Sequence, residues 1–145
     1  MPLIQITAPQ GALETSARNA LVSRVGNAVL RSEGASPSDP AAQALVWSQY
    51  RELSDGALYV GGDNSAPQPL QIAVTTPAGA LDAQARAALV REIGEIVDDL
   101  IGPFEGRLNH WAMLFEVAEG SWAGGGQVFP LAGIQAAMNI DPIGV

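Results

Sequence analysis

The residue with the clearest chemical potential is Pro2, which follows Met1 and precedes the apolar, strand-like run Leu3-Ile4-Gln5-Ile6. If Met1 is removed, the ring nitrogen of Pro2 becomes a secondary amine. A free α-amine titrates near pH 8, and burial lowers the pKa of an amine because it disfavours the charged form. Such a nitrogen is suited to act as a general base at neutral pH. A proline is also tolerated for structural reasons at the first position of a strand, so the rest of the chain must decide.

The composition argues against several other kinds of site. The chain has no cysteines, which removes disulfides, thiolate metal sites and cysteine nucleophiles. Its single histidine, His110, is not accompanied by a Gly-x-Ser-x-Gly nucleophile motif, and metal sites built on histidine need more than one. We therefore expect a protein that works without a metal or another cofactor.

The charge balance argues against nucleic acid as a partner. The 145 residues carry a formal net charge of −8 and contain arginine but no lysine, so no basic face is expected to neutralise phosphates. An apolar share of 48% is enough for the core of one domain. No apolar run approaches the roughly 20 residues of a membrane span, and the start lacks the basic region of a signal peptide. We expect a soluble, cytoplasmic protein with no membrane partner.

An internal repeat is the most informative feature of the sequence. Residues 2–30 align without a gap to residues 70–98, and a second block of matches follows at a slightly shorter spacing. The identical pairs include Ile4/Ile72, Thr7/Thr75, Pro9/Pro77, Gly11/Gly79, Arg18/Arg86, Leu21/Leu89, Gly26/Gly94, Trp47/Trp111, Gly61/Gly125 and Gly62/Gly126. We interpret this pattern as a duplication, with repeat 1 at 2–62, repeat 2 at 69–126 and a C-terminal tail at 127–145 of a single domain.

Each half reads as a strand, a helix, a second strand and a glycine-rich turn. The expected strands are 3–6, 44–53, 70–75 and 110–117, the expected helices are 14–32 and 82–101, and 34–40 is expected to be a loop. A strand, a crossover helix and a strand in one sheet should be parallel and right-handed. The sequence thus predicts an α/β (α+β) fold, with two tandem βαβ units forming a four-stranded mixed sheet and two helices on one face. The uncovered sheet face predicts a homo-oligomer.

Together these features resemble the tautomerase superfamily, which includes 4-oxalocrotonate tautomerase, macrophage migration inhibitory factor and cis-3-chloroacrylic acid dehalogenase. Pro2-Leu3-Ile4-Gln5-Ile6 is similar to the family's N-terminus, and Leu58-Tyr59-Val60-Gly61-Gly62 resembles its aromatic-x-Ile-Gly-Gly turn. The fused length and Trp111 with Phe115-Glu116 most resemble the cis-dehalogenase layout. The resemblance implies a tautomerase-like fold, a homotrimer and a catalytic role for Pro2, as a base or, in the dehalogenase and decarboxylase branches, as a cation or acid.

The departures from the family pattern concern its charged residues. The positions where the family has arginine fall at Ala12, Trp47, Pro77, Ala80 and Trp111, and the dehalogenase glutamate falls near Gly124. An arginine binds a carboxylate through two parallel hydrogen bonds, so these losses weaken the case for a carboxylate-bearing substrate. Losing the water-activating glutamate weakens the case for hydrolytic dehalogenation.

The remaining candidates for the substrate pocket are mostly apolar. By resemblance, Trp111 and Met113 match positions that reach a neighbouring subunit's pocket, and Trp122 matches the family's pocket aromatic. All three could equally be core residues. Arg51 could replace the missing anchor or could be a solvated edge charge. We expect His110 to be structural or to face a partner, and the glycines at 124–126 to form a conformational turn rather than a phosphate cradle.

The sequence leaves three functions open. The first is a keto–enol tautomerase in which Pro2 is the general base and the substrate is a small apolar or aromatic carbonyl compound. The second is a dehalogenase, hydratase or decarboxylase of a three-carbon acid. The third is a non-catalytic trimeric relative that kept Pro2 as a strand starter.

Overall fold

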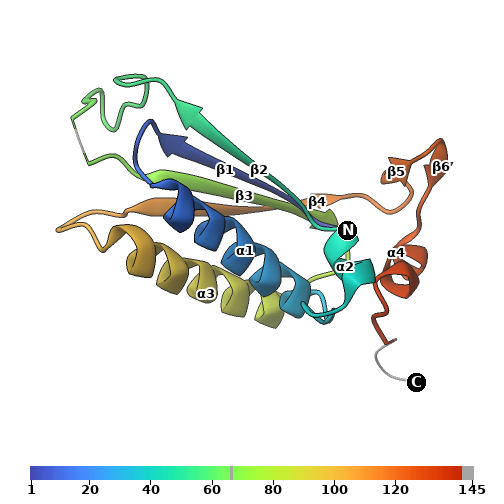
Figure 1. The fold of residues 1–145 in the computed structure, drawn as a ribbon. Coiled ribbons are helices and arrows are strands. Elements are labelled where there is room, and N and C mark those ends of the chain that lie inside the picture. Colours follow the sequence, from blue (N-terminus) through green and yellow to red (C-terminus); the bar gives the residue numbers. More distant parts are fainter. Residues whose placement is uncertain (66, 142–145) are drawn as a thin grey trace.

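The computed structural model describes residues 1–65 and 67–141. Strands β1 (Leu3–Pro9), β2 (Trp47–Leu53), β3 (Leu70–Pro77) and β4 (His110–Val117) form one sheet in the order β2-β1-β3-β4. Helices α1 (Thr15–Ser32) and α3 (Ala83–Ile101) lie side by side over one face of it (Figure 1). The remaining elements are α2 (Pro40–Ala44), a small hairpin of β5 (Ala123–Gly124) and β6 (Gln127–Val128), and α4 (Leu131–Ala137).

The two repeats meet at the centre of the sheet. β1 runs parallel to β2, and β3 runs parallel to β4, so each repeat forms one parallel pair. β1 and β3 are antiparallel, with Ile6 opposite Ile72. The predicted four-stranded mixed sheet with two helices on one face is confirmed.

Alternation along the strands directs apolar side chains toward the helices. In β1, Ile4, Ile6 and Ala8 are buried, while the residues between them lie on the other face. The helices meet this layer with apolar residues at helical spacing. Those that are fully or almost fully buried are Leu21, Val25, Ala28 and Val29 from α1, and Leu89, Ile93, Ile96 and Val97 from α3.

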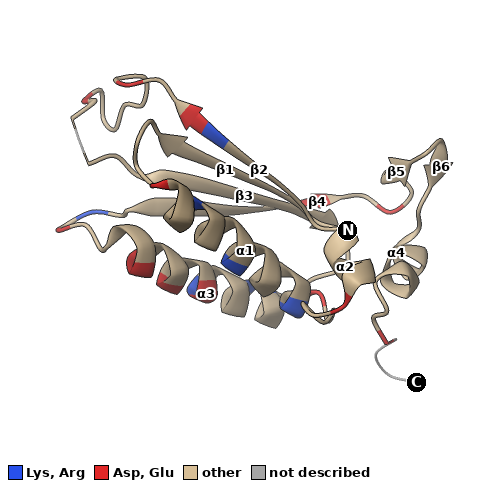
Figure 2. Ribbon diagram, viewed as in Figure 1, with Lys and Arg blue, Asp and Glu red and all other residues tan. Residues whose placement is uncertain are grey.

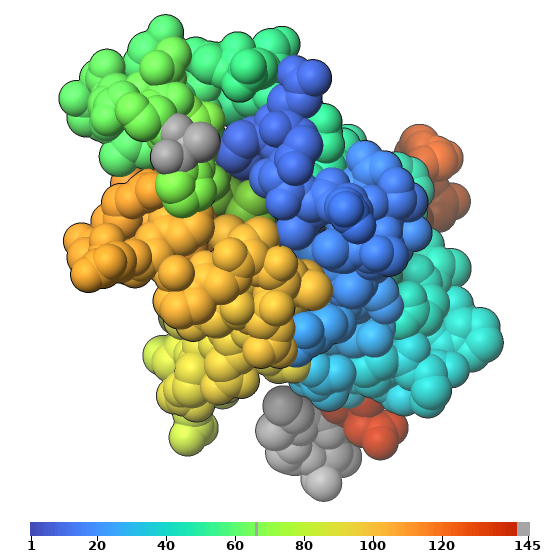
Figure 3. Space-filling model, turned by 60° about the vertical axis from the view of Figure 1, so that its left-hand side comes forward, coloured from blue at the N-terminus to red at the C-terminus, as the bar shows by residue number. Residues whose placement is uncertain are grey.

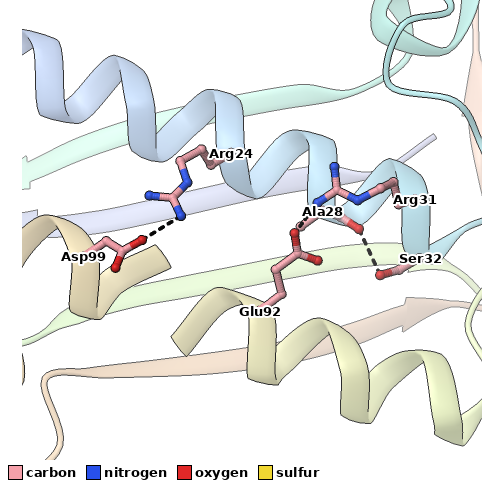
Figure 4. A network of polar contacts seen from close by, with 6 residues as sticks. All are labelled: Arg24, Ala28, Arg31, Ser32, Glu92 and Asp99. Atoms are coloured by element: carbon pink, nitrogen blue, oxygen red, sulfur yellow. Dashed lines mark hydrogen bonds and ion pairs between the residues drawn. The ribbon is translucent and has the colours of Figure 1, made fainter. Parts of the chain in front are cut away.

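Ion pairs link the outer sides of the two helices. Arg24 of α1 donates to Asp99 of α3 at 2.8 Å, and Arg31 pairs with Glu92 about two turns further along (Figure 4). These side chains are partly exposed, so each pair adds little to stability. Figure 2 shows that charged residues gather along the helices and at the loops, whereas the corner with the N-terminus, β5, β6 and α4 carries few.

The start of the second strand differs from the sequence prediction. Residues 44–53 were expected to be extended, but Pro40–Ala44 forms α2 and β2 begins at Trp47. Asp39 caps this short helix by accepting from the Ala41 amide at 2.9 Å, and Pro40 occupies its first position, where no amide donor is needed. β3 also continues to Pro77, beyond the expected end at 75.

The C-terminal tail contains a strand and a helix that the sequence did not predict. β6 and α4 fall within 127–145, of which residues 142–145 lie outside the described part of the chain. Ile134 and Met138 are buried in a second core cluster with Leu30, Ala35 and Ala42, and the Met1 side chain packs against it. Glu119 accepts from the Leu131 amide at 3.1 Å and so anchors the start of α4. The tail therefore closes over the N-terminal corner of its own chain (Figure 1).

The face of the sheet away from the helices is uncovered in the single chain. The register places its residues in three rows, which are Trp47–Leu3–Thr75–Phe115, Gln49–Gln5–Ala73–Met113 and Arg51–Thr7–Gln71–Trp111. Two of the corner residues, Trp47 and Trp111, have 71% and 60% of their surface exposed. We refer to these twelve residues as the open face.

Within residues 1–65 and 67–141, no helix combines the length and apolar character required to traverse a lipid bilayer.

Candidate active site

Pro2 is buried directly before β1, and its carbonyl oxygen accepts a hydrogen bond from the Trp47 amide at 3.1 Å. This bond ties the start of β1 to the start of β2. Pro2 lines a cavity of about 740 Å³ at the N-terminal corner. Three parts of the chain form the other walls, namely the end of α2 with Trp47, the β5–β6 hairpin, and the segment that follows the hairpin. The lining residues include Leu45, Trp47, Trp122, Gly124, Gly125, Gln127 and Phe129.

The hairpin wall depends on its glycines. Gly125 and Gly126 have φ angles of +58° and +81°, which are the left-handed values needed at both central positions of a two-residue type I′ hairpin turn. The Phe129 amide donates to the Trp122 carbonyl at 2.9 Å and holds the two aromatic residues on either side of the hairpin. A Cβ at Gly124 would lie 3.2 Å from the Phe129 ring, so this position favours glycine. The expected conformational turn at 124–126 is present.

The charged groups nearest the cavity are the Met1 ammonium and the Glu33 carboxylate. Among the described residues that line it, no side chain carries a charge. The Met1 ammonium lies 3.4 Å from Glu33 Oε2 and 2.7 Å from the Met138 sulfur. Burial lowers the pKa of this amine, although Glu33 acts in the opposite direction. Burial likewise raises the pKa of Glu33, against the effect of the ammonium. An amine at this corner is thus desolvated, as the sequence reading required.

A second, smaller cavity of about 380 Å³ occupies the equivalent place in the other repeat. Leu70, Trp111 and the segment 58–61 line it, and their repeat counterparts Pro2, Trp47 and 122–125 line the first cavity. Arg107 also lines it and donates to the Pro67 carbonyl at 2.5 Å, which joins the two loops seen side by side in Figure 3. Because Leu70 lies within the chain, its nitrogen is an amide, and this cavity has no candidate base equivalent to Pro2.

The structure brings together only some of the residues singled out from the sequence. Pro2 and Trp122 line the same cavity, whereas Trp111 lines the second one. Met113 is in the middle row of the open face, and Arg51 is in the row farthest from Pro2. Within one chain, neither residue lines either cavity.

His110 lies on the helix-facing side of β4, close to Gly94. Its Nδ1 is 2.7 Å from the Asn109 side-chain oxygen, and burial lowers the pKa of the ring. Asn109 in turn donates to Asp98 and to the Gly102 carbonyl, so the group fastens β4 to the end of α3. This placement agrees with a structural role.

Sequence reasoning missed Trp47 and Phe129, which line the Pro2 cavity, and Glu33, which contacts Met1 beside it. Trp47 could have been found as the repeat counterpart of Trp111. Glu33 aligns with Ile101 of the second repeat, and a carboxylate in place of an apolar residue was an available signal. Phe129 lies in the tail beyond the repeats, where no internal comparison was possible.

Comparisons with known proteins agree with the architecture. The sequence matches no family model and no curated protein. Several solved structures share the fold. A structure titled "F6 fused 4-OT wild type asymmetric trimer" is 18% identical with a TM-score of 0.72, and the match covers 87% of this chain and 94% of that one. The structure of N1, from the cis-3-chloroacrylic acid dehalogenase family, is 19% identical with a TM-score of 0.72 over 92% and 87% of the two chains.

A third similar structure is that of Pt0534 inactivated by 2-oxo-3-pentynoate, which is 22% identical with a TM-score of 0.71 and covers 86% of this chain and 92% of that one. Identities this low establish the fold, while the chemistry must be argued from this chain's own residues. The chain has the fold of the tautomerase superfamily.

Proposed function

We propose that this protein is a keto–enol tautomerase in which Pro2, freed by removal of Met1, is the general base. The observation that carries the proposal is the place of Pro2, which is buried beside an apolar cavity large enough for a small organic substrate. Desolvation at this corner lowers the pKa of the Met1 amine, and the same effect would act on the neighbouring Pro2 amine after processing.

The reaction requires only proton transfer. The neutral Pro2 nitrogen removes a proton from the carbon next to the substrate carbonyl, and the electrons of that C–H bond form the enolate. The resulting Pro2 ammonium pairs with the enolate and returns the proton to oxygen or to carbon. The base is regenerated, and the substrate and product are isomers. A well-placed base of this kind contributes about 10²–10⁴-fold to a rate.

The cavity walls define the proposed substrate class. Trp47, Trp122 and Phe129 offer apolar and aromatic surface, which suits an aromatic or aliphatic carbonyl compound. Trp111, Met113 and Arg51 remain candidates through a neighbouring copy, because the open face presents all three to a partner. Arg51 is then either a substrate anchor supplied across the interface or an exposed edge charge.

We also propose that the protein is a cytoplasmic homotrimer. The uncovered open face supports an oligomer, and the similar fused 4-OT structure is described as a trimer. The acidic, cysteine-free composition supports the location.

The test begins with the intact mass, which reports whether Met1 has been removed. For the processed protein we expect measurable enolisation of phenylacetaldehyde, an aromatic carbonyl compound without a carboxylate, followed by NMR as exchange of its α-protons for deuterium. Pro2→Ala should lower kcat/KM at least 100-fold with an unchanged circular dichroism spectrum. The matched control is Pro9→Ala, at the other end of β1 and away from the cavity, which should keep the rate. Full activity in Pro2→Ala would exclude the proposal.

A covalent probe gives an independent readout. The compound in the similar Pt0534 structure, 2-oxo-3-pentynoate, is an electrophilic alkynyl ketone. The Pro2 nitrogen would add to its triple bond, forming a C–N bond while the proton moves to carbon. Mass spectrometry should place the whole adduct mass on the N-terminal peptide of the processed chain. Labelling elsewhere in the chain, or equal labelling when Met1 is retained, would contradict a free Pro2 amine as the reactive group.

The second candidate is a dehalogenase, hydratase or decarboxylase, which the similarity to N1 favours at the level of fold. It would need a cation for the substrate carboxylate, and the described lining of the Pro2 cavity supplies none. Incubation with 3-haloacrylates and malonate semialdehyde, followed by NMR, distinguishes this candidate from a tautomerase. A non-catalytic relative would give no turnover in either assay.

A further inference from the structure

Glu33 is a buried carboxylate in an unusual position. It is the C-terminal cap of α1, and its side chain is only 2% exposed. Its Oε2 atom faces the Met1 ammonium at 3.4 Å, while Oε1 is buried without a hydrogen-bond partner. A buried carboxylate oxygen without a hydrogen-bond partner costs free energy of folding. A negative charge at a helix C-terminus is also unfavourable, because it interacts with the negative end of the helix dipole.

The fold does not require a carboxylate at this position. The repeat counterpart of Glu33 is Ile101, an apolar residue at the end of α3. The neighbouring cluster around Leu30 and Met138 is apolar as well. An isoleucine would therefore suit this corner structurally. The fold does not explain the carboxylate of Glu33, whereas binding of a ligand would.

Met1 occupies the space between the Pro2 cavity, which it lines, and Glu33, which it contacts. Its side chain packs against the same cluster as Trp122 and Phe129, and its ammonium contacts Glu33. Removing Met1 frees this space and leaves Glu33 without its cationic partner. Since one residue spans at most about 3.6 Å, the Glu33 carboxylate lies no more than about 7 Å from the Pro2 nitrogen. A small molecule can bridge that distance.

We propose that Glu33 is the polar anchor of the Pro2 site and that it binds an ammonium group on the substrate. The ligand class is thus an amino-substituted carbonyl compound with an apolar body, in which the amine takes the place of the Met1 ammonium. An ammonium can satisfy both carboxylate oxygens through charge-assisted hydrogen bonds. The apolar walls would hold the rest of the molecule, and no arginine is needed.

This inference rests on the proposed function only for the identity of the reacting group, so binding can test it separately. The probes are 2-phenylethylamine, 2-phenylethanol and phenylacetate, which share an aromatic ring but differ in charge. Their affinities are measured by NMR titration of the processed protein. We expect the amine to bind at least tenfold more tightly than phenylacetate. Protein that retains Met1 should bind the amine at least tenfold more weakly, because its own ammonium fills the site.

Two substitutions isolate the carboxylate. Glu33→Gln keeps the shape, and Glu33→Ile installs the residue of the second repeat, so at least one of them should fold. Each folded variant should lose at least tenfold in affinity for the amine while Glu33→Gln keeps its affinity for the alcohol. Glu105→Gln, at an exposed glutamate in the loop before β4, is the matched control and should bind all three probes as the parent does.

The outcomes separate the two proposals. Pro2→Ala should keep the preference for the amine even though it lowers kcat/KM at least 100-fold, since Glu33 is intact. Equal binding of the three probes, or a preference for the amine that survives loss of Glu33, would overturn the anchor while leaving Pro2 as a base. A lower pKa of the Pro2 amine in Glu33→Gln with no change in probe affinity would likewise overturn it, because Glu33 would then serve only as the counter-ion of the base.

Discussion

The buried contact between Met1 and Glu33 makes the stability of the unprocessed chain depend on pH in one direction. Burial raises the pKa of Glu33 above its ordinary value of 4.5, so the folded state binds this proton more tightly than the unfolded state does. The associated stability is full below the ordinary pKa and is lost as the pH rises through the folded-state pKa. We therefore predict that Glu33→Gln gains stability relative to the parent as the pH rises from about 4 to 7.

Urea unfolding of the Met1-retaining chains at several pH values measures this difference. Glu105→Gln serves as the control, because an exposed carboxylate should leave the pH profile of the parent unchanged. A difference between Glu33→Gln and the parent that does not vary with pH would mean that the acid is solvated in the folded protein.

The residues in and beside the Pro2 cavity show which individual residues the sequence could and could not predict. Pro2 is identified by its residue type and its place after Met1, and Trp122 by its match to the pocket aromatic of the family that the sequence resembles. Glu33 was missed because its role depends on the Met1 ammonium, which α4 and Met138 hold beside it. That contact joins residues at opposite ends of the chain, and no local pattern predicts it.

At the scale of elements, the repeat supplies two matching turns with different neighbours. Gly61 and Gly125 both have a φ of +58°, and a Cβ added at either would meet nothing within 4 Å. Alanine at a left-handed position costs about 1–2 kcal/mol. We predict that Gly61→Ala and Gly125→Ala lose similar free energies of unfolding, because the strain is the same in both turns.

Only the second turn borders Pro2, so function should separate the two variants. Gly125→Ala should slow labelling of Pro2 by 2-oxo-3-pentynoate, and Gly61→Ala should label at the parent rate. Gly125→Asn, whose side chain tolerates the left-handed region, should recover part of the lost stability. The expectation fails if the two alanine variants differ widely in stability or label at the same rate.

The elements themselves were predictable to different degrees. Strong periodicity and capping residues placed α1, α3 and β4 almost to the residue. The sequence does not predict α2, because an Asp-Pro pair such as Asp39-Pro40 is typical of loops as well as of helix starts. α4 is only seven residues long and depends on Ile134 and Met138 packing into the second core, which is a tertiary effect.

At the scale of the whole molecule, the distribution of apolar surface is asymmetric. The helix-facing side of the sheet is buried, whereas the open face leaves Trp47, Trp111 and Phe115 more than half exposed. Scattered exposed apolar residues are ordinary, but these three share one face of one sheet. Both edge strands, β2 and β4, contribute, so a partner could contact either side.

The last prediction follows from this face. We expect light scattering after size-exclusion chromatography to give about three times the mass of one chain at micromolar concentration. Phe115→Glu should shift the protein toward monomer, because a carboxylate on the open face would be buried in the interface without a partner. Val90→Glu makes the same kind of change at an exposed position of α3, on the side away from the open face, and should leave the mass unchanged. A parent protein that runs as a stable monomer would contradict the trimer, and it would confine the Pro2 site to residues of its own chain, which would remove Trp111, Met113 and Arg51 as contributors.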